Sequence, residues 1–310
     1  MLSAVIPCYN EALVLDALLD RLIPVLENCD SPYEVVLVDD GSSDPTWDRM
    51  LTLQGQFPCL RCVKLSRNFG HQQALSAGLD LARGDFVVVL DADLQDPPEV
   101  VPQMLELARQ GYDVVYGQRQ GRLGETAFKR QSASAFYRLM NRLVERPMPE
   151  DSGDFRLLSR RALEALKALP EYHRFLRGMV SWIGFRQVAL PYRREARHAG
   201  QTKYPLGKMF AFATDAITSF SVVPLRIASW IGVMTAGMGA LLLLYSLYSY
   251  FYLNAVPGWA SVICAISLLS SVQLLVLGVM GEYLGRLYEQ SKHRPIYFIE
   301  ELRESTVTAA

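Results

Sequence analysis

The sequence predicts an α/β domain with a mostly parallel sheet covered by helices on both faces, followed by a hairpin of two transmembrane helices. Up to about residue 118, short β-rich runs alternate with helical patterns, as in parallel strands joined by crossover helices. Residues 227–281 contain no Asp, Glu, Lys or Arg, whereas the first two thirds of the chain have the charge content of an ordinary globular protein. The chain therefore divides into a charged N-terminal part and an apolar C-terminal part.

The predicted strands are near-continuous apolar runs, which is the pattern of strands buried on both faces. In chain order they are SAVIPCYN, YEVVLVDDGS, RCVKLSRN, DFVVVLDADL and YDVVYGQR, with QVALPYR as a later strand. Helical patterns separate or follow them at about 11–29, 44–54, 70–83, 97–109 and 126–145.

Polar residues follow four of the predicted strands. They are Asn10, then Asp39-Asp40-Gly41, then Arg67-Asn68, then Asp91-Ala92-Asp93. Ligands of open α/β sheets bind at the carboxyl ends of the strands, so these positions predict a binding site. No GxGxxG follows the first strand, which disfavours a dinucleotide-binding domain. Gly41 predicts a turn that needs a positive φ.

Asp91 and Asp93 predict a metal site. Alternate residues of a strand face the same way, so the two carboxylates converge if the extended geometry continues. A divalent cation such as Mg²⁺ or Mn²⁺, bridged to substrate phosphates, removes the repulsion between them. We expect no histidine or cysteine nearby, and we interpret the CLRC segment at 59–62 as thiols without a zinc ion.

Asp39 can accept a hydrogen bond from a nucleobase imide or from a ribose hydroxyl. Its alternative is a helix-capping or turn role, which Ser42, Ser43 and Asp44 fill more naturally.

Two apolar segments, 227–253 and 259–281, each exceed the roughly 20 residues that cross a bilayer as a helix. The alternative is a pair of buried core helices. Basic residues flank the hairpin on both outer ends, which predicts a two-pass protein in the cytoplasmic membrane with both termini in the cytoplasm. Residues 205–224 suit either a helix in the interface plane or a helix packed on the globular domain.

These patterns predict four parts. They are a cytoplasmic domain at 1–204, an interfacial segment at 205–225, a transmembrane part at 226–284 and a cytoplasmic tail at 285–310. Small residues in the spans would let copies of the hairpin pack as a homo-oligomer. The 31 basic and 32 acidic residues nearly cancel, so we expect no nucleic-acid partner.

Several motifs carry a resemblance to a known family. VIPCYNE, VDDGSSD, LSRNFGHQQALSAG and LDADLQDPPE resemble the sugar-nucleotide-binding half of family-2 glycosyltransferases, which have the GT-A fold. YGQR, FKRQSASAFYRLMN, SGDFRLLSR, RHAGQTKYP and GEYLGRLYEQSKHRPIY resemble the polyprenyl-phosphate glycosyltransferases. Among these the chain is most similar to bactoprenol glucosyltransferases, and it is more distantly similar to dolichol-phosphate mannose synthases.

The resemblance implies roles for matching residues. The nucleotide-sugar pocket would include Pro7, Tyr9, Asn10, Glu11, Asp39, Asp40, Arg67, Asp91, Ala92, Asp93 and Gln95. Asp91, Asp93 and Gln95 would hold Mg²⁺ or Mn²⁺, and Asp93 and Asp154 would be catalytic. Arg119 with Lys129 or Arg130 would bind the lipid phosphate, and Arg197 and Lys203 would bind the diphosphate.

The implied reaction transfers a hexose, expected to be glucose from UDP-glucose, to undecaprenyl phosphate by an inverting, metal-dependent displacement. A phosphate acceptor is already a nucleophile, so Asp154 is expected to orient rather than to abstract a proton. UDP-GlcNAc and GDP-mannose remain alternative donors. A processive synthase is disfavoured because RGMVSWIG lacks the QxxRW motif. A non-enzymatic scaffold that binds nucleotide sugars also stays open.

Overall fold

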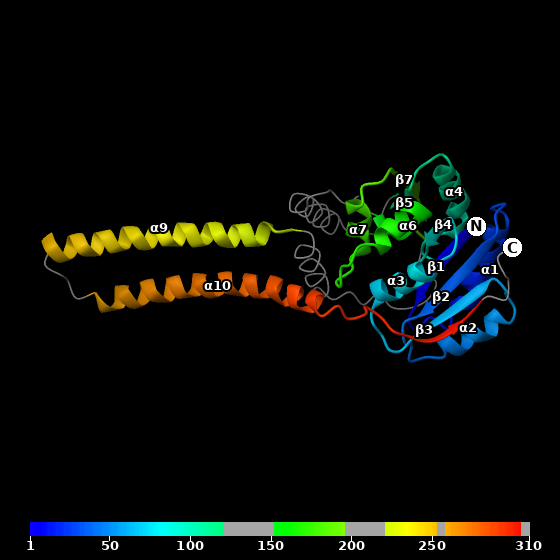
Figure 1. Cartoon of the computed structure of the whole chain (residues 1–310), viewed down its shortest axis with the longest axis horizontal. Helices are drawn as coiled ribbons and strands as arrows, with labels where there is room; N and C mark the ends of the chain where they lie inside the picture. Colours follow the sequence, from blue (N-terminus) through cyan, green and yellow to red (C-terminus); the bar gives the residue numbers. More distant parts are fainter. Residues whose placement is uncertain (121–151, 196–220, 253–257, 305–310) are drawn as a thin grey trace. The chain divides into compact units, whose positions relative to one another are not determined.

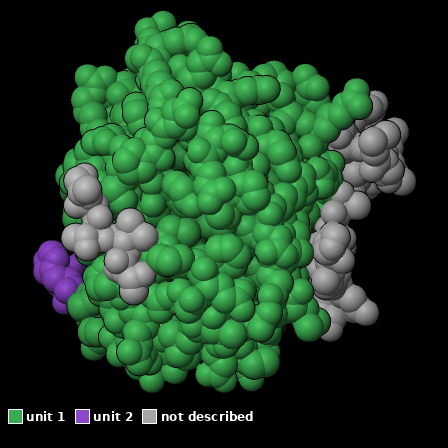
Figure 2. Space-filling view, turned by 90° about the vertical axis from the view of Figure 1, so that its right-hand side faces the viewer, with its two compact units in different colours: residues 1–142, 146–208, 294–310 green, residues 143–145, 209–293 purple. Residues whose placement is uncertain are grey.

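The computed structural model describes residues 1–120, 152–195, 221–252 and 258–304. The chain forms two compact units, which Figure 2 colours separately. The first comprises residues 1–142, 146–208 and 294–310, and the second comprises residues 143–145 and 209–293.

The first unit is built on a mixed sheet with the strand order β7-β5-β6-β4-β1-β2-β3-β8 in the described part of the chain. The strands are β1 (Leu2–Cys8), β2 (Tyr33–Asp39), β3 (Leu60–Leu65), β4 (Phe86–Val89), β5 (Val114–Arg119), β6 (Ser152–Ser159), β7 (Gln187–Tyr192) and β8 (Ile299–Arg303). The central strands β4, β1, β2 and β3 are parallel. Strand β6 is antiparallel to β4 and β5, and β8 is antiparallel to β3.

Helices cover both faces of this sheet (Figure 1). On one face lie α1 (Leu15–Glu27), α2 (Thr46–Gln54) and α4 (Val101–Arg109), which follows the short helix η1 (Pro98–Val100). On the other lie α3 (His71–Leu81), α6 (Arg160–Lys167) and α7 (Leu176–Trp182). Gly78 allows α3 to lie close to the sheet, because a Cβ there would collide with the side chain of Val5 in β1. The predicted mostly parallel sheet with two helical layers is confirmed.

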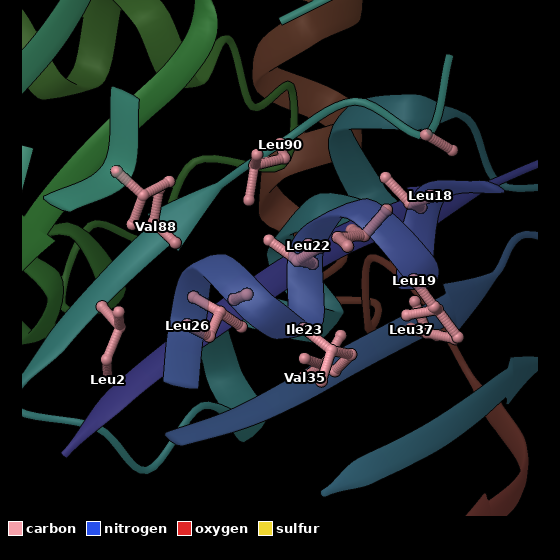
Figure 3. Packing of buried hydrophobic residues seen from close by; sticks show 14 of the residues in the cluster. Leu2, Leu18, Leu19, Leu22, Ile23, Leu26, Val35, Leu37, Val88 and Leu90 are labelled. Carbon is pink, nitrogen blue, oxygen red and sulfur yellow. The ribbon is translucent and has the colours of Figure 1, made fainter. Parts of the chain in front are cut away.

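Helix α1 shows why these residues form a core. Its apolar side chains recur at helical spacing and all lie inward: Leu15, Leu18, Leu19, Leu22, Ile23 and Leu26. Figure 3 labels Leu18, Leu19, Leu22, Ile23 and Leu26 of this helix beside Leu2 of β1, Val35 and Leu37 of β2, Val88 of β4, and Leu90 just after β4. Each fully buried leucine contributes about 1.5–3 kcal/mol of hydrophobic free energy. This packing holds β1, β2 and β4 in parallel, so their carboxyl ends lie at one edge.

Two strands are not predicted by the sequence pattern. Strand β6 contains Gly, Asp and Arg within the run SGDFRLLS, and β8 has the charged sequence IEELR. Strand β8 lies at the edge of the sheet, where one side needs no apolar neighbour. Residues 285–310 are therefore not only a tail: α10 continues to Ser291, and residues 299–303 belong to the sheet of the first unit.

The second unit contains the helices α9 (Val223–Tyr252) and α10 (Trp259–Ser291). Within them, Val223–Tyr245 and Leu268–Ser291 are long and apolar enough to cross a membrane. Their large apolar side chains are exposed, for example Trp230, Leu243 and Leu274 at 69%, 62% and 68%. A contiguous apolar surface of this kind marks a membrane or protein contact, so the alternative of two buried core helices is wrong. The predicted helices at 126–145 and 205–224 lie outside the described residues, apart from positions 221–224.

Candidate active site at the carboxyl ends of the strands

The acidic residues predicted from the sequence gather at one edge of the sheet. Cys8 at the end of β1 pairs with Asp39 at the end of β2, and β4 runs parallel to both. Strand β6 starts at the same edge, because its Arg156 pairs with Val89 at the end of β4. Asp154 and Asp91 both lie at this edge, since each has a carboxylate oxygen within 4 Å of His71 Nε2.

Asp39 has one carboxylate oxygen engaged and one without a partner. The side chain is fully buried. Its Oδ1 accepts a hydrogen bond of 3.1 Å from the backbone N–H of Ser42. Its Oδ2 is buried and has no hydrogen-bond partner among the described residues. Burial raises the pKa of Asp39, and this effect exceeds the lowering of the pKa by the hydrogen bonds from Ser42. A buried oxygen without a partner destabilises the folded protein unless a ligand donates a hydrogen bond to it.

Asn10 connects the end of β1 to the loop after β2. Its backbone has a left-handed φ of 57°, which asparagine tolerates better than most residues. Its Oδ1 accepts from the backbone N–H groups of Ser43 and Asp44 at 2.8 and 3.3 Å, and its own N–H donates to Ser42 Oγ at 2.9 Å. The backbone N–H of Glu11 donates to Thr46 Oγ1 at 2.9 Å. These bonds position the first two strand ends relative to each other.

Asp40 organises the loop between β3 and α3. Its two oxygens accept from the backbone N–H groups of Phe69 and Gly70 at 2.7 and 2.9 Å. Asp40 is 3% exposed, so its carboxylate is used within the protein. Gly41 has a φ of 64°, as predicted, and a Cβ there would collide with the backbone of Arg67. The exposed Arg67 stacks its guanidinium on the Phe69 ring at 3.9 Å.

Asp91 and Asp93 lie just beyond β4, and the chain between them is not extended as expected. Strand β4 ends at Val89, and Leu94 has a left-handed φ of 58°. Asp93 Oδ1 accepts from the backbone N–H of Gln95 at 3.1 Å, which closes a turn. Asp91 Oδ1 is buried without a hydrogen-bond partner among the described residues. Burial raises the pKa of Asp91 to about 6, with His71 opposing the shift.

The described residues do not provide a complete set of metal ligands from side chains alone. Within the described ranges, no three His, Cys, Asp or Glu side chains form a group that could hold a metal ion. The amide nitrogen of Gln95 donates to the backbone carbonyl of Glu195 at 3.4 Å, so only its Oε1 could serve as a ligand. Cys59 and Cys62 of the CLRC segment are buried free thiols.

Asp154 is the centre of a polar cluster between β6, α3 and α7. Arg177 binds it at two points, with Nε 2.8 Å from Oδ1 and Nη2 3.0 Å from Oδ2. Two more side chains reach the same Oδ2: His71 through Nε2 at 3.3 Å and Gln72 through Nε2 at 3.4 Å. Burial would raise the pKa of Asp154, but the charge of Arg177 and the bonds from His71 and Arg177 hold it well below its usual range. The carboxylate is thus ionised and paired.

His71 corrects the expectation that no histidine lies near the acidic pair. It is the first residue of α3, and its Nε2 lies 3.8 Å from Asp91 Oδ1 as well as 3.3 Å from Asp154 Oδ2. Burial alone would lower the pKa of His71, but Asp154 and Asp91 together raise it. Sequence reasoning missed both His71 and Arg177. The available signal was the position of His71, six residues after the end of β3.

Arg119 ends β5 beside the start of β6. A Cβ on Gly153 would come within 2.6 Å of Arg119 Nη2, so the glycine leaves room for the guanidinium. Arg119 Nε donates to the Tyr192 hydroxyl at 3.3 Å, and that hydroxyl donates to Asp96. The second oxygen of Asp96 is buried without a partner in the described part of the chain.

The remaining predicted residues divide into two groups. Pro7 and Ala92 are buried at the strand ends, and Tyr9 is 48% exposed. Lys129, Arg130, Arg197 and Lys203 lie outside the described residues.

The mixed sheet with its acidic carboxyl edge defines the chain as an α/β protein with a candidate ligand site, and two of its helices are long and apolar enough to cross a membrane. The chain belongs to glycosyltransferase family 2, whose family model, Glycosyl transferase family 2, matches residues 3–167. This confirms the resemblance drawn from the motifs.

Curated relatives match almost the whole chain. "Bactoprenol glucosyl transferase" of Shigella phage SfV is 38% identical over 98% of this chain and 99% of its own length. "Prophage bactoprenol glucosyl transferase homolog" of Escherichia coli K12 is 36% identical over the same shares. "Uncharacterized glycosyltransferase YkcC" of Bacillus subtilis is 44% identical over 96% of this chain and 93% of its own.

Solved structures are more distantly similar. Glucosyl-3-phosphoglycerate synthase from Mycobacterium tuberculosis, in complex with Mn²⁺, UDP and glucosyl-3-phosphoglycerate, has a TM-score of 0.45 at 23% identity. The likeness covers 70% of this chain and 77% of that one. Staphylococcus aureus TarS 1–349 has a TM-score of 0.42 at 19% identity, covering 61% and 57%.

Proposed function

We propose that this protein transfers glucose from UDP-glucose to undecaprenyl phosphate at the cytoplasmic face of a membrane. One observation carries this proposal. Relatives named bactoprenol glucosyl transferase align with 98% of the chain, so the similarity includes the apolar helices as well as the acidic edge. A lipid acceptor gives both parts of the molecule a role.

The uridine would bind beside Asp39. Its buried Oδ2, which has no partner among the described residues, suits the imide N–H of a uracil or a ribose hydroxyl. A hydrogen bond to an ionised acceptor is among the stronger ones in proteins. Pro7, Tyr9, Asn10 and Glu11 would form the rest of this wall. We assign Asp40 to the loop that carries Arg67, because both of its oxygens bind backbone N–H groups.

Asp91 and Asp93 would hold a divalent cation together with the donor diphosphate. The residues fit such an ion: their donors are hard carboxylate oxygens, and Asp91 Oδ1 is buried without a hydrogen-bond partner in the described chain. Mg²⁺ is usually bound by one or two carboxylates plus substrate phosphates, which agrees with the small number of protein ligands here. When bound, Mg²⁺ or Mn²⁺ would stabilise the charge on the leaving diphosphate. Gln95 Oε1 is a further candidate ligand.

Asp154 would orient groups at the acceptor side rather than remove a proton. The phosphate monoester carries about −1.5 to −2 charges near neutral pH and needs no strong base. The two-point pairing of Asp154 with Arg177 and its depressed pKa support this role, because a strongly paired carboxylate is a weak base. Arg119, with Lys129 or Arg130, would bind the lipid phosphate. Arg197 and Lys203 would bind the diphosphate, and a single displacement would invert the anomeric carbon.

The hairpin α9–α10 would anchor the enzyme where its acceptor lies. A polyprenyl tail stays in the bilayer, so the phosphate is available only at the membrane surface. Basic residues on the outer flanks, such as Arg226 and Arg294, favour both flanks on the cytoplasmic side.

A donor panel tests the proposal. Purified full-length protein is given undecaprenyl phosphate, Mg²⁺ or Mn²⁺, and one of UDP-glucose, UDP-galactose, UDP-GlcNAc or GDP-mannose, each labelled in the sugar. The proposal predicts label in the organic phase from UDP-glucose. Label from another donor alone would replace the sugar assignment. Binding of UDP without transfer from any donor would favour the non-enzymatic scaffold instead.

A further inference from the structure

The pairing of Arg177 with Asp154 has the geometry of a positioning device. Arg177, in α7, directs two guanidinium nitrogens to the two carboxylate oxygens at 2.8 and 3.0 Å. This two-point arrangement fixes the plane of the carboxylate as well as its position. Asp154 is 4% exposed, so it has little access to water as an alternative partner.

The same carboxylate joins the starts of two helices. Gln72, in the first turn of α3, donates its amide to Asp154 Oδ2 at 3.4 Å. Its Oε1 accepts from the backbone N–H of Leu176, the first residue of α7, at 3.0 Å. The neighbouring His71 lies between Asp154 Oδ2 at 3.3 Å and Asp91 Oδ1 at 3.8 Å. Asp154 thus determines where the imidazole lies relative to Asp91.

We propose that Arg177 is a positioning residue of the transfer reaction, which acts through Asp154 to hold His71 beside Asp91. This inference rests on the proposed function, because it takes the edge at Asp91 and Asp154 to be the transfer site. Without Arg177, the other arginine that lies near Asp154 in the described part of the chain is Arg156, whose Nη2 lies 3.9 Å from Oδ1. The carboxylate would turn toward it, and His71 would lose its anchor on Oδ2.

Kinetics of four variants test the inference in the full-length protein. Arg177→Gln, Arg177→Lys, Asp154→Asn and the double variant Arg177→Gln/Asp154→Asn are compared for kcat and donor KM. We expect Arg177→Gln to lower kcat about 100-fold, the loss typical of a misplacement near 1 Å, with donor KM within about twofold. Arg177→Lys keeps the positive charge but cannot bind both carboxylate oxygens in the same plane, so it should retain about a tenth of wild-type kcat. In the Asp154→Asn background, Arg177→Gln should add less than about a threefold loss, because the two residues act as a unit.

The control is Arg161→Gln, which removes another arginine that binds an aspartate at two points, Asp113, at 3.1 and 2.5 Å. We expect its kcat to stay within about twofold of wild type. Equal losses from Arg177→Gln with and without Asp154 would overturn the inference, and so would an Arg177→Gln variant as active as the control. If Arg177→Gln does not fold, as judged by lost UDP binding, Arg177→Lys takes its place. The inference then requires that Arg177→Lys lowers kcat while donor KM stays within about twofold of wild type.

A structural measurement separates this inference from the proposed substrates. In a structure of the Arg177→Gln protein, we expect His71 Nε2 to lie more than about 4 Å from Asp154 Oδ2, beyond hydrogen-bond distance. An unchanged His71 position would overturn the inference even if glucose transfer is confirmed. A displaced His71 in a protein that transfers another sugar would retain the inference and reject only the substrate assignment.

Discussion

Asp39 ends β2 with Oδ1 bonded to Ser42 and with Oδ2 buried and unpartnered among the described residues. Such an oxygen keeps the cost of its desolvation until a donor reaches it. A bound uracil or ribose would supply that donor. Asp39 would therefore destabilise the empty protein and strengthen the binding of a nucleotide.

Asp39→Asn should weaken UDP binding. The neutral amide removes a charge-assisted hydrogen bond worth about 1.5–3 kcal/mol, which corresponds to a dissociation constant about 10- to 150-fold higher. Isothermal titration of UDP in the presence of Mn²⁺ measures the change. Asp48→Asn, on the exposed side of α2, is the control and should bind like wild type. Equal UDP affinity for wild type and Asp39→Asn would remove Asp39 from the pocket.

Sequence reasoning identifies the strand-end acids but not their partners. Asp39, Asp91 and Asp93 follow apolar strands, so local pattern alone places them at the edge. His71 and Arg177 reach Asp154 only through packing of α3 and α7 on the sheet, and no local pattern encodes such a contact. The role of Asp40 is equally hard to predict from sequence. Its hydrogen bonds from Phe69 and Gly70 depend on the path of the loop between β3 and α3.

Strand β8 is the element that most extends the predicted fold. Its end is bound to the sheet by Glu304, which accepts from the buried Arg61 at 2.7 Å and from Arg83 at 2.9 Å. Gln54 donates to the carbonyls of Arg303 and Glu304 at 3.2 and 3.0 Å. The chain that follows α10 is thereby attached to the sheet that carries the site.

Glu304→Gln should destabilise the first unit. Arg61 has a side chain only 5% exposed, and the loss of its ionised partner leaves it with weaker compensation for its burial. We expect a loss of about 1–3 kcal/mol, or a midpoint of thermal unfolding about 2–12 °C lower. Circular dichroism of the detergent-solubilised protein measures the shift.

Glu301→Gln is the matched control for that shift. Its partner Arg303 lies two residues away on the same strand and is 57% exposed, so the pair contributes less than about 1 kcal/mol. Thermal midpoints that fall equally in both variants would show that Glu304 is no more than a surface charge.

The strands with an apolar pattern are those that sequence predicts well. Strands β1 to β5 and β7 each contain such a run, and most of them are buried between helices. Strand β6 places Asp154 and Arg156 toward the polar cluster, so its functional residues interrupt the apolar pattern. Strand β8 is five residues long and lies at an edge, where charged residues are favourable because they discourage pairing with other chains.

At the scale of the whole molecule, composition separates the two units. The charge-free segment predicts the apolar helices, and α9 and α10 expose most of their large apolar residues. The helices are longer than the sequence boundaries suggested, since α9 begins at Val223 and α10 continues to Ser291. Charged residues at the end of α10, such as Glu282 and Arg286, pair with each other at 3.1 Å and so do not end the helix.

The central claim is that carboxylates at the strand ends and a metal ion act together in transfer to a lipid phosphate. The most direct test measures labelled glucose transferred from UDP-glucose to undecaprenyl phosphate by full-length protein that has been treated with a chelator. We predict no transfer until Mg²⁺ or Mn²⁺ is added back, restored transfer in wild type, and at least about a 100-fold lower rate in Asp93→Asn at every metal concentration. Full transfer in the presence of chelator, or an Asp93→Asn protein as active as wild type, would contradict the account.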